Sequence, residues 1–157
     1  MGLQFSAATL KRFDELVSRY PKKEAAMLPV LYLAQEEFGY LSAEAIDYVA
    51  KMMELSPARV YGVVTFYTML NMKPIGRHHL QVCRTLSCML SGSEKITSFL
   101  KAKLGIGLGD TTLDGKFTFS EVECLASCGT GPMMQINDDY YENLTEERVE
   151  EILKTLK

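Results

Sequence analysis

Four cysteines stand in two close pairs in this sequence of 157 residues. Cys83 and Cys88 are separated by four residues, and Cys124 and Cys128 by three. Four thiolates are the ligand set of a 2Fe-2S cluster, of a 4Fe-4S cluster or of a structural zinc ion. The cysteines therefore indicate metal or redox chemistry more than disulfide cross-links, which are disfavoured in the reducing compartment that we expect for this chain.

The spacing within each pair helps to choose among these centres. Zinc knuckles usually use Cys-x2-Cys, whereas these wider loops better enclose two irons, with one cysteine pair to each. A 4Fe-4S site of the bacterial ferredoxin kind needs three cysteines close together, which this sequence lacks. His78 and His79 form no Cys-x-His pair, so we reject a Rieske centre and interpret them as polar strand residues. The spacing favours 2Fe-2S and leaves zinc as the alternative.

Glycines and apolar residues lie near both cysteine pairs. Gly129 and Gly131 are expected to let backbone amides approach sulfur, and such hydrogen bonds change the reduction potential of a cluster. Apolar side chains are expected to restrict water around the sulfurs, although core packing explains the methionines equally well. These side chains are Leu86, Met89, Leu90, Met133 and Met134.

The elements that position the cysteines begin after a helical first part. Ser6 is placed to cap a helix that ends near Tyr20. A second helical pattern covers residues 24–38 and is closed by Gly39. Pro29 is awkward inside this pattern and marks either the true start of the helix or a kink.

Two more helices are predicted before the first cysteine pair. Ser42 is placed to cap a helix over residues 43–55. Ser56 and Pro57 are typical of the start of the next helix. The β-branched and aromatic run from Val60 onward fits helix or strand, and we predict helix.

The pattern changes near Pro74 and Gly76, where we place a domain boundary. A strand over residues 77–83 is expected to stop at Cys83. Ser91 and Glu94 form a capping-box pattern that predicts a helix over residues 94–104.

The last part of the chain alternates strand and turn signals. Asp114 and Gly115 predict a two-residue hairpin whose second arm leads to Cys124. Two short strands are expected within residues 133–144, about an Asn-Asp-Asp turn. Thr145 is placed to cap a final helix. The second half is therefore predicted to be mixed α/β.

Composition excludes several classes of function. With 17 basic and 20 acidic residues and a net charge of -3, the chain offers no large positive field, so nucleic-acid binding is not expected. The sequence has neither a secretory signal pattern nor an apolar run long enough to span a bilayer, so we expect a soluble, intracellular chain. It also lacks a Gly-rich phosphate loop between strand and helix, a motif that would indicate a flavin or nicotinamide site.

Several motifs together resemble the 24 kDa subunit family of NADH:quinone oxidoreductase, respiratory complex I. They are "VYGVVTFYTML", "VCRTLSC", "LGIGLGDTTLDGKFTFSEVECLASCGTGPMMQINDDYY" and the final Thr-Glu-Glu helix. The likeness covers nearly the whole chain. It implies an α+β fold, with a helical bundle over residues 1–75 and a thioredoxin-like ferredoxin domain over residues 76–157. It also implies that one 2Fe-2S cluster is bound by Cys83, Cys88, Cys124 and Cys128.

The same resemblance implies a role and partners. The chain would be a peripheral, non-catalytic electron-transfer subunit, and its cluster would exchange single electrons with the FMN of a neighbouring flavoprotein subunit that binds NADH. A larger iron-sulfur subunit would lie beside it. We expect no direct membrane insertion, a bacterial source, and a position at the cytoplasmic face of the inner membrane through the complex. The chain alone is not expected to oxidise NADH.

The sequence departs from the family pattern near the second cysteine pair. Ala126 and Ser127 stand where the resemblance leads us to expect Gly-Ala, and Gly131 stands where Ala is usual. These changes leave the cysteines intact. They affect the hydrogen bonding around sulfur, and so the reduction potential that we expect.

Three alternatives stay open from the sequence. The first is the equivalent subunit of an NAD-linked hydrogenase or formate dehydrogenase, which has a similar flavoprotein partner. The second is a zinc-stapled interaction module without redox function. Thioredoxin-like disulfide exchange is the third, and the absence of a Cys-x-x-Cys motif from the sequence argues against it.

Overall fold

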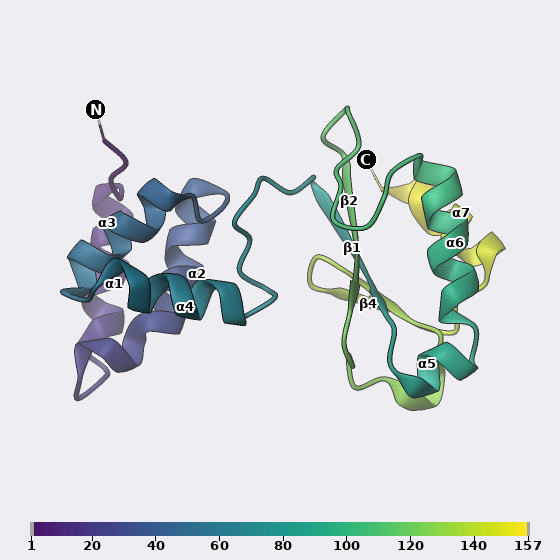
Figure 1. The fold of residues 1–157 in the computed structure, drawn as a ribbon, viewed down its shortest axis with the longest axis horizontal. Coiled ribbons are helices and arrows are strands. Elements are labelled where there is room, and N and C mark those ends of the chain that lie inside the picture. The colour runs from purple at the N-terminus through teal and green to yellow at the C-terminus, as the bar shows by residue number, and fades with distance from the viewer. Residues whose placement is uncertain (1, 157) are drawn as a thin grey trace. The chain divides into compact units, whose positions relative to one another are not determined.

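A computed structural model describes residues 2–156, and Figure 1 shows their helices and strands. The chain divides into two compact units between Pro74 and Ile75. Helices make up the first unit, and the second combines helices with a sheet. That the two units fold independently stays a prediction.

The first unit is built from capped helices. In order they are α1 (Ala7–Val17), a 3-10 turn η1 (Lys23–Ala26), α2 (Met27–Phe38), α3 (Ala43–Met53) and α4 (Pro57–Phe66). The side chain of Ser6 accepts a hydrogen bond from the Thr9 N–H, and that of Ser42 accepts one from the Ala45 N–H, at 3.2 and 3.1 Å. Both predicted caps are therefore confirmed, because each oxygen satisfies a backbone donor that the helix leaves free.

The position of Pro29 explains where α2 begins. The helix starts at Met27, so Pro29 lies in its first turn, where a backbone N–H has no partner within the helix to lose. The residues just before it form the η1 turn instead, and the helix therefore starts later than the predicted residue 24. Gly39 ends α2 with φ of 81°, as predicted, a conformation that glycine adopts without strain.

The helix α4 settles the ambiguity of the β-branched run. Residues from Pro57 to Phe66 are helical, as predicted, with Ser56 at the N-cap position but without a side-chain cap bond. Val60 and Val64 are buried in the core of this unit, because residues four apart share one helix face. Phe66 is 75% exposed.

The core of the first unit is formed by buried side chains from all its helices. They include Phe13, Val30, Leu31, Ile46, Val49, Val60 and Val64. Phe5, which precedes α1, stacks on Phe38 with ring centroids 5.3 Å apart and meets Tyr48 edge-on at 5.0 Å. These ring contacts fasten the N-terminal segment to α2 and α3.

The second unit holds a four-stranded sheet among the described residues. The elements in order are β1 (His78–Cys83), α5 (Leu86–Leu90), α6 (Ser93–Leu104), β2 (Phe117–Val122), η2 (Cys128–Thr130), β3 (Met134–Ile136), β4 (Asp139–Tyr141) and α7 (Glu146–Thr155). The strand order is β2-β1-β3-β4. β1 and β2 run parallel, and the other neighbouring strands run antiparallel.

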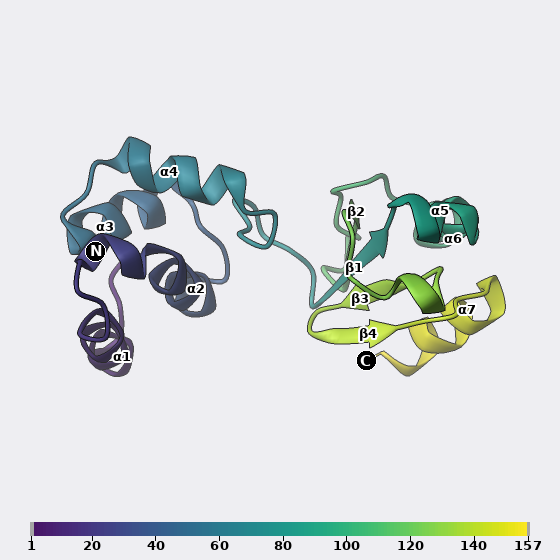
Figure 2. The same ribbon diagram turned by 90° about the horizontal axis from the view of Figure 1, so that it is seen from below.

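The helices α6 and α7 lie side by side over one face of the sheet (Figures 1 and 2). Alternate residues of β1 point to this face, so Leu80 and Val82 are fully buried while Gln81 between them is not. The helices and strands together bury a second core that includes Ile96, Leu100, Phe119, Met134, Ile136, Val149 and Ile152. The predicted combination of a helical part with a mixed helix-and-sheet part is confirmed.

The predicted capping box of Ser91 and Glu94 is wrong. Ser91 instead ends the short helix α5, and its N–H donates to the carbonyl of Ser87 at 3.0 Å. The N-cap of α6 is Gly92, with φ of 99° and no side-chain cap bond. Ser91 does not cap α6 because its backbone already belongs to the preceding turn.

The predicted hairpin at Asp114 and Gly115 is confirmed in part: Thr111 and Thr118 form an antiparallel bridge across this turn, but its loop is longer than the predicted two residues. The carboxylate of Asp114 accepts hydrogen bonds from the Thr112 hydroxyl and the Lys116 N–H, at 2.5 and 3.0 Å, and draws the turn into a wider loop. The Thr112 N–H closes this loop on the carbonyl of Phe117 at 2.8 Å. Only β2, the second arm, is a strand, and it pairs with β1 along its whole length.

Candidate metal centre

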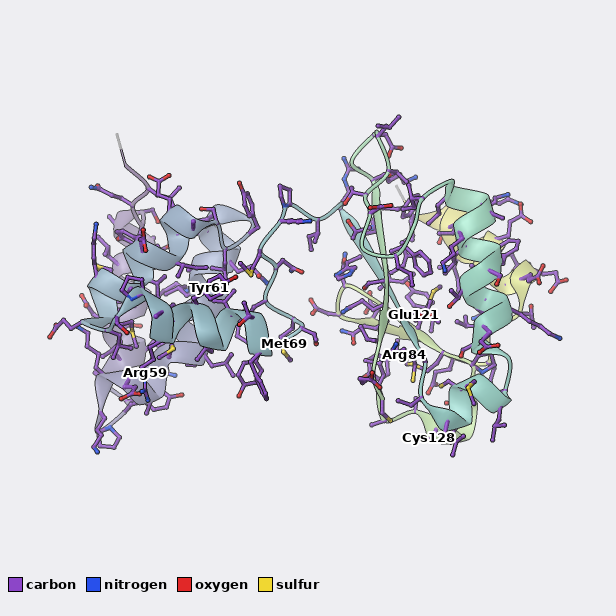
Figure 3. The ribbon with its side chains drawn as sticks, viewed as in Figure 1. Arg59, Tyr61, Met69, Arg84, Glu121 and Cys128 are labelled. Carbon is purple, nitrogen blue, oxygen red and sulfur yellow. The ribbon has the colours of Figure 1, made fainter. Side chains whose placement is uncertain are left out.

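The four predicted cysteines meet at one end of the sheet. Cys83 is the last residue of β1 and lies opposite Val122, the last residue of β2. Cys124 follows β2 directly after Glu123, so the parallel pairing of the two strands brings the cysteine pairs together. Cys88 lies in α5, which packs against η2, where Cys128 is the first residue. Figure 3 labels Cys128 at this end of the unit.

The sulfurs are arranged as two pairs. Sγ of Cys124 and Sγ of Cys128 are 3.7 Å apart. Two thiolates bound to one tetrahedral metal at about 2.3 Å lie about 3.8 Å apart. Cys83 and Cys88 are also hydrogen-bonded to each other. Among residues 2–156, no three or more His, Cys, Asp or Glu side chains gather in a way that would hold one metal ion.

The two pairs differ in burial. Cys83 and Cys88 are 2% and 1% exposed, whereas Cys124 and Cys128 are both exposed. Met133, which is fully buried, packs against the first pair. The centre therefore has one side inside the protein and one side at its surface.

The predicted apolar cover over the sulfurs is only partly present. Met133 provides it, but Met134 belongs to the core beneath the sheet. The predicted cover by the apolar residues of α5 is wrong, because this short helix turns Cys88 inward and its three large apolar side chains outward. Leu86, Met89 and Leu90 are 66%, 42% and 76% exposed.

Hydrogen bonds make the two thiols of the buried pair unequal. Burial opposes ionisation of Cys83, but donors from the Thr85 hydroxyl and the N–H groups of Leu125 and Thr85 outweigh burial and lower its pKa. Burial raises the pKa of Cys88 to about 11, and its hydrogen bond to Cys83 adds to the effect. A backbone N–H from Met133 acts in the opposite direction on Cys88.

The two thiols of the exposed pair also differ in the direction of their pKa shifts. The Ala126 N–H donates to Sγ of Cys124 at 3.3 Å, and this hydrogen bond, with one from Cys128, lowers the pKa of Cys124. The pKa of Cys128 is raised because its thiol donates to Cys124 and lies near the negative charge there. In each pair the pKa of one thiol is lowered and that of the other is raised, and a metal that binds both sulfurs replaces their protons.

Two hydroxyls of the first cysteine loop also serve the second pair. The Thr85 hydroxyl lies 3.3 Å from Sγ of Cys83 and also hydrogen-bonds to Cys124. The Ser87 side chain hydrogen-bonds to Cys128. These hydroxyls link the buried pair to the exposed pair. Sequence reasoning missed them, although a hydroxyl residue two positions after Cys83 and another directly before Cys88 are usable signals.

Gly131 lets the backbone approach a sulfur, as the sequence predicted. The backbone N–H groups that donate to sulfur belong to Thr85, Leu125, Ala126 and Met133. Gly131 is needed for space, since a Cβ placed there would lie 3.3 Å from Sγ of Cys88. Around Gly129 no atom lies within 4 Å of such a Cβ.

Ala126 has a left-handed backbone conformation, with φ of 61°. Glycine adopts this conformation freely, whereas a residue with a Cβ is strained in it. The structure therefore explains why glycine is the expected residue here. The alanine keeps the loop shape, and with it the N–H that faces Cys124.

The two histidines lie in β1. Nε2 of His79 is 2.8 Å from the Ser120 hydroxyl of the neighbouring strand, and burial lowers the pKa of this imidazole. The interpretation of His79 as a polar strand residue agrees with these contacts.

Within residues 2–156 no helix has the length and apolar character needed to cross a membrane.

Comparisons with known proteins point to the same chemistry. The sequence profile of the thioredoxin-like 2Fe-2S ferredoxin family matches residues 13–157. The chain is 47% identical over 152 residues to the NADH-quinone oxidoreductase subunit designated E of Rickettsia felis, and the match covers 95% of this chain and 91% of that protein. It is 42% identical over 147 residues to the NADH-quinone oxidoreductase subunit designated E 2 of Rhizobium meliloti, covering 94% and 88%.

A solved structure shares the fold. The crystal structure of an NAD+-reducing NiFe-hydrogenase in its air-oxidised state superposes with a TM-score of 0.72 at 19% sequence identity. The match covers 83% of this chain and 22% of the hydrogenase chain. At this identity the likeness concerns the fold.

Proposed function

This chain belongs to the thioredoxin-like 2Fe-2S ferredoxin family, and on that premise we propose that it is an electron-transfer subunit of an NADH-quinone oxidoreductase. The resemblance predicted from its motifs is confirmed by the profile match and by curated relatives that are 42–47% identical over nearly the whole chain. Those relatives are named as subunits of that enzyme.

The observation that carries the proposal is the meeting of two cysteine pairs at the ends of β1 and β2. We propose Cys83, Cys88, Cys124 and Cys128 as the ligands of one 2Fe-2S cluster. The donor set fits this group, because four sulfurs are present in two pairs and backbone N–H groups face Cys83, Cys88 and Cys124. A bound 2Fe-2S cluster supplies storage for one electron at a time.

Groups of this chain around the cysteines favour cluster binding. The N–H of Ala126 and the hydroxyl of Thr85 stabilise negative charge on sulfur, which favours metal binding and affects the reduction potential. Met133 and the end of the sheet keep water from Cys83 and Cys88. The exposed pair offers the side on which a partner can approach.

The partners follow from the chemistry of NADH. A nicotinamide delivers two electrons together as a hydride, so a flavin must stand between it and a one-electron centre. We therefore propose a neighbouring subunit that binds NADH and FMN as the source of the electrons, with a larger iron-sulfur subunit in the same complex. In this proposal the chain is non-catalytic and lies at the cytoplasmic face of a bacterial inner membrane.

The test is anaerobic reduction of the purified chain, followed by visible absorption and iron analysis. The protein should contain about two irons, should bleach with dithionite, and should not bleach with NADH until the flavoprotein subunit is added. Full bleaching by NADH without flavin would overturn the assigned role. A colourless protein that retains zinc after anaerobic reconstitution would overturn the cofactor, and co-purification with a hydrogenase instead would reassign the complex.

A further inference from the structure

A carboxylate is hydrogen-bonded to the loop that carries the exposed cysteine pair. Oε1 of Glu142 accepts a hydrogen bond from the Thr130 hydroxyl at 2.6 Å and another from the Ser127 hydroxyl. The two hydroxyl oxygens are 2.7 Å apart. Each hydroxyl has a single proton, so with both donated to the carboxylate the two oxygens are held together by their shared acceptor. Hydrogen bonds to an ionised acceptor are stronger than neutral ones.

The segment that carries Glu142 is itself fixed against the same loop. The Asn143 N–H donates to the carbonyl of Thr130 at 2.8 Å, and the Leu144 N–H donates to the carbonyl of Pro132 at 2.9 Å. The Leu144 side chain is buried in the core of the sheet. Glu142 therefore reaches the loop from a backbone that the sheet and α7 hold in place.

The position of the contact matters because Ser127 is adjacent to Cys128 and lies within the loop between the two exposed cysteines. We propose that Glu142 is a positioning residue for the iron-sulfur centre, which fixes the Cys124–Cys128 loop through the hydroxyls of Ser127 and Thr130. In doing so it holds a negative charge beside the exposed pair, which lowers the reduction potential. This inference rests on the proposed function, since it assumes that the cysteines bind the cluster.

Ser127 is one of the residues that depart from the family pattern, in which the resemblance predicts alanine. An alanine has no hydroxyl, so Glu142 would keep Thr130 as its partner in this network and lose Ser127. The second hydroxyl in this chain therefore makes the attachment of the loop tighter. It also gives Glu142 a contact with the residue that directly precedes Cys128.

The first experiment compares the full chain with its variants Glu142→Gln, Ser127→Ala and Thr130→Val, all loaded with iron and sulfide. Glu142→Gln should raise the reduction potential in a redox titration followed by electron paramagnetic resonance, because it removes the negative charge. Ser127→Ala and Thr130→Val should each raise the potential by a smaller amount, because the carboxylate loses one of its two attachments. Glu142 is exposed and Ser127 and Thr130 are half-buried, so none of the three substitutions changes a fully buried side chain.

A matched control separates this effect from a general change of charge. Glu146→Gln removes a carboxylate four positions further on, at the start of α7, where its side chain is exposed. It should shift the potential less than Glu142→Gln does. A second measurement is the rate at which a chelator removes the iron. This rate should rise by about tenfold in Glu142→Gln and stay near the unsubstituted value in Glu146→Gln.

The coupling of the three side chains gives the sharpest test. In a Ser127→Ala/Thr130→Val background the carboxylate is no longer attached to the loop, so adding Glu142→Gln should change the potential by less than it does alone. An equal shift in both backgrounds would overturn the positioning role, as would a Glu142→Gln shift no larger than that of Glu146→Gln. Absence of a 2Fe-2S signal from the unsubstituted chain would instead overturn the proposed function.

Discussion

Arg84 donates from two guanidinium nitrogens to Oε1 of Glu123, at 3.0 and 2.7 Å. Arg84 directly follows Cys83, and Glu123 directly precedes Cys124. The ion pair therefore joins the chain next to one buried cysteine with the chain next to one exposed cysteine. The Arg84 N–H adds a backbone hydrogen bond to the carbonyl of Val122 at 3.0 Å, which extends the pairing of β1 and β2 beyond their last residues.

The two charges of this ion pair should act on the centre with opposite signs. Arg84→Gln removes a positive charge beside Cys83 and should lower the reduction potential, whereas Glu123→Gln removes a negative charge beside Cys124 and should raise it. Both side chains are more than half exposed, so the shifts should be small and should shrink as salt is added. A redox titration of both variants and of the double variant checks this. Shifts of the same sign would mean that the pair acts by holding the strands together.

Cys124 should be required for the cluster, and His79 should not. Cys124→Ala removes one sulfur from the exposed pair, so the loaded protein should lose most of its visible absorption and iron. His79→Ala removes a side chain that contacts Ser120 within the sheet, and the spectrum should be retained. Iron content and absorption per chain measure both effects. A normal 2Fe-2S signal in Cys124→Ala would mean that the ligands are misassigned.

Replacing Ala126 by glycine should stabilise the protein. A left-handed alanine costs about 1–2 kcal/mol of stability, which glycine would relieve. The greater freedom of glycine in the unfolded chain offsets about 0.4–1 kcal/mol of this gain. The net gain should be up to about 1.6 kcal/mol, measured by denaturant unfolding with the cluster bound. Ala102→Gly is the control, because Ala102 is exposed in α6, where glycine should destabilise by about 1 kcal/mol. Equal signs for the two substitutions would contradict the explanation.

Acid should destabilise the helical unit through Glu37. The Thr9 hydroxyl donates to its carboxylate at 2.6 Å and the Ser6 N–H at 2.9 Å, and these donors hold the pKa of Glu37 below its usual value of 4.5. Because the unfolded chain takes up this proton at a higher pH, the stabilisation is complete above pH 4.5 and is lost as the pH falls through the pKa of the folded state.

Thermal unfolding of Glu37→Gln between neutral and acidic pH tests this expectation. Glutamine keeps an acceptor oxygen but does not titrate, so the advantage of the unsubstituted chain should disappear as the pH falls below 4.5. Asp47→Asn, a change at an exposed carboxylate of α3, serves as the control and should retain the acid sensitivity. If the unfolding temperatures of Glu37→Gln and of the unsubstituted chain differ by the same amount at every pH, the assigned role of Glu37 is contradicted.

The two units should fold as separate chains. Each has its own buried core, and the cysteines all belong to the second unit. A chain of residues 75–157 should therefore assemble the cluster, and a chain of residues 1–74 should be colourless but unfold cooperatively from a helical state. Circular dichroism and iron analysis check the two expectations. A soluble, folded chain of residues 75–157 that fails to take up iron would contradict this division.

Local patterns made part of this structure predictable. Ser6, Ser42 and Thr145 cap helices as predicted, because a cap depends on residues only three positions away. The placing of Cys83 after a run of strand-forming residues is equally local. The association of both cysteine pairs with strands was therefore accessible from the sequence, although their meeting depends on the parallel pairing of β1 with β2.

Other features depend on contacts that local patterns do not contain. The helix α5 is too short to show a helical period, and its presence moved Ser91 out of the predicted cap. The Asp114 loop follows from side-chain hydrogen bonds that compete with a tight hairpin. The contact of Glu142 with Ser127 joins residues 15 positions apart and forms because β3 and β4 return the chain to the cysteine loop.

The unequal burial of the cysteine pairs would give the assembly and the loss of a bound cluster one common route. Cys124 and Cys128 are exposed, so iron and sulfide delivered from solution would reach these sulfurs before the buried Cys83 and Cys88. A chelator would approach a bound cluster from the same side. The stability of the loop between Cys124 and Cys128 would then limit how long a loaded cluster survives.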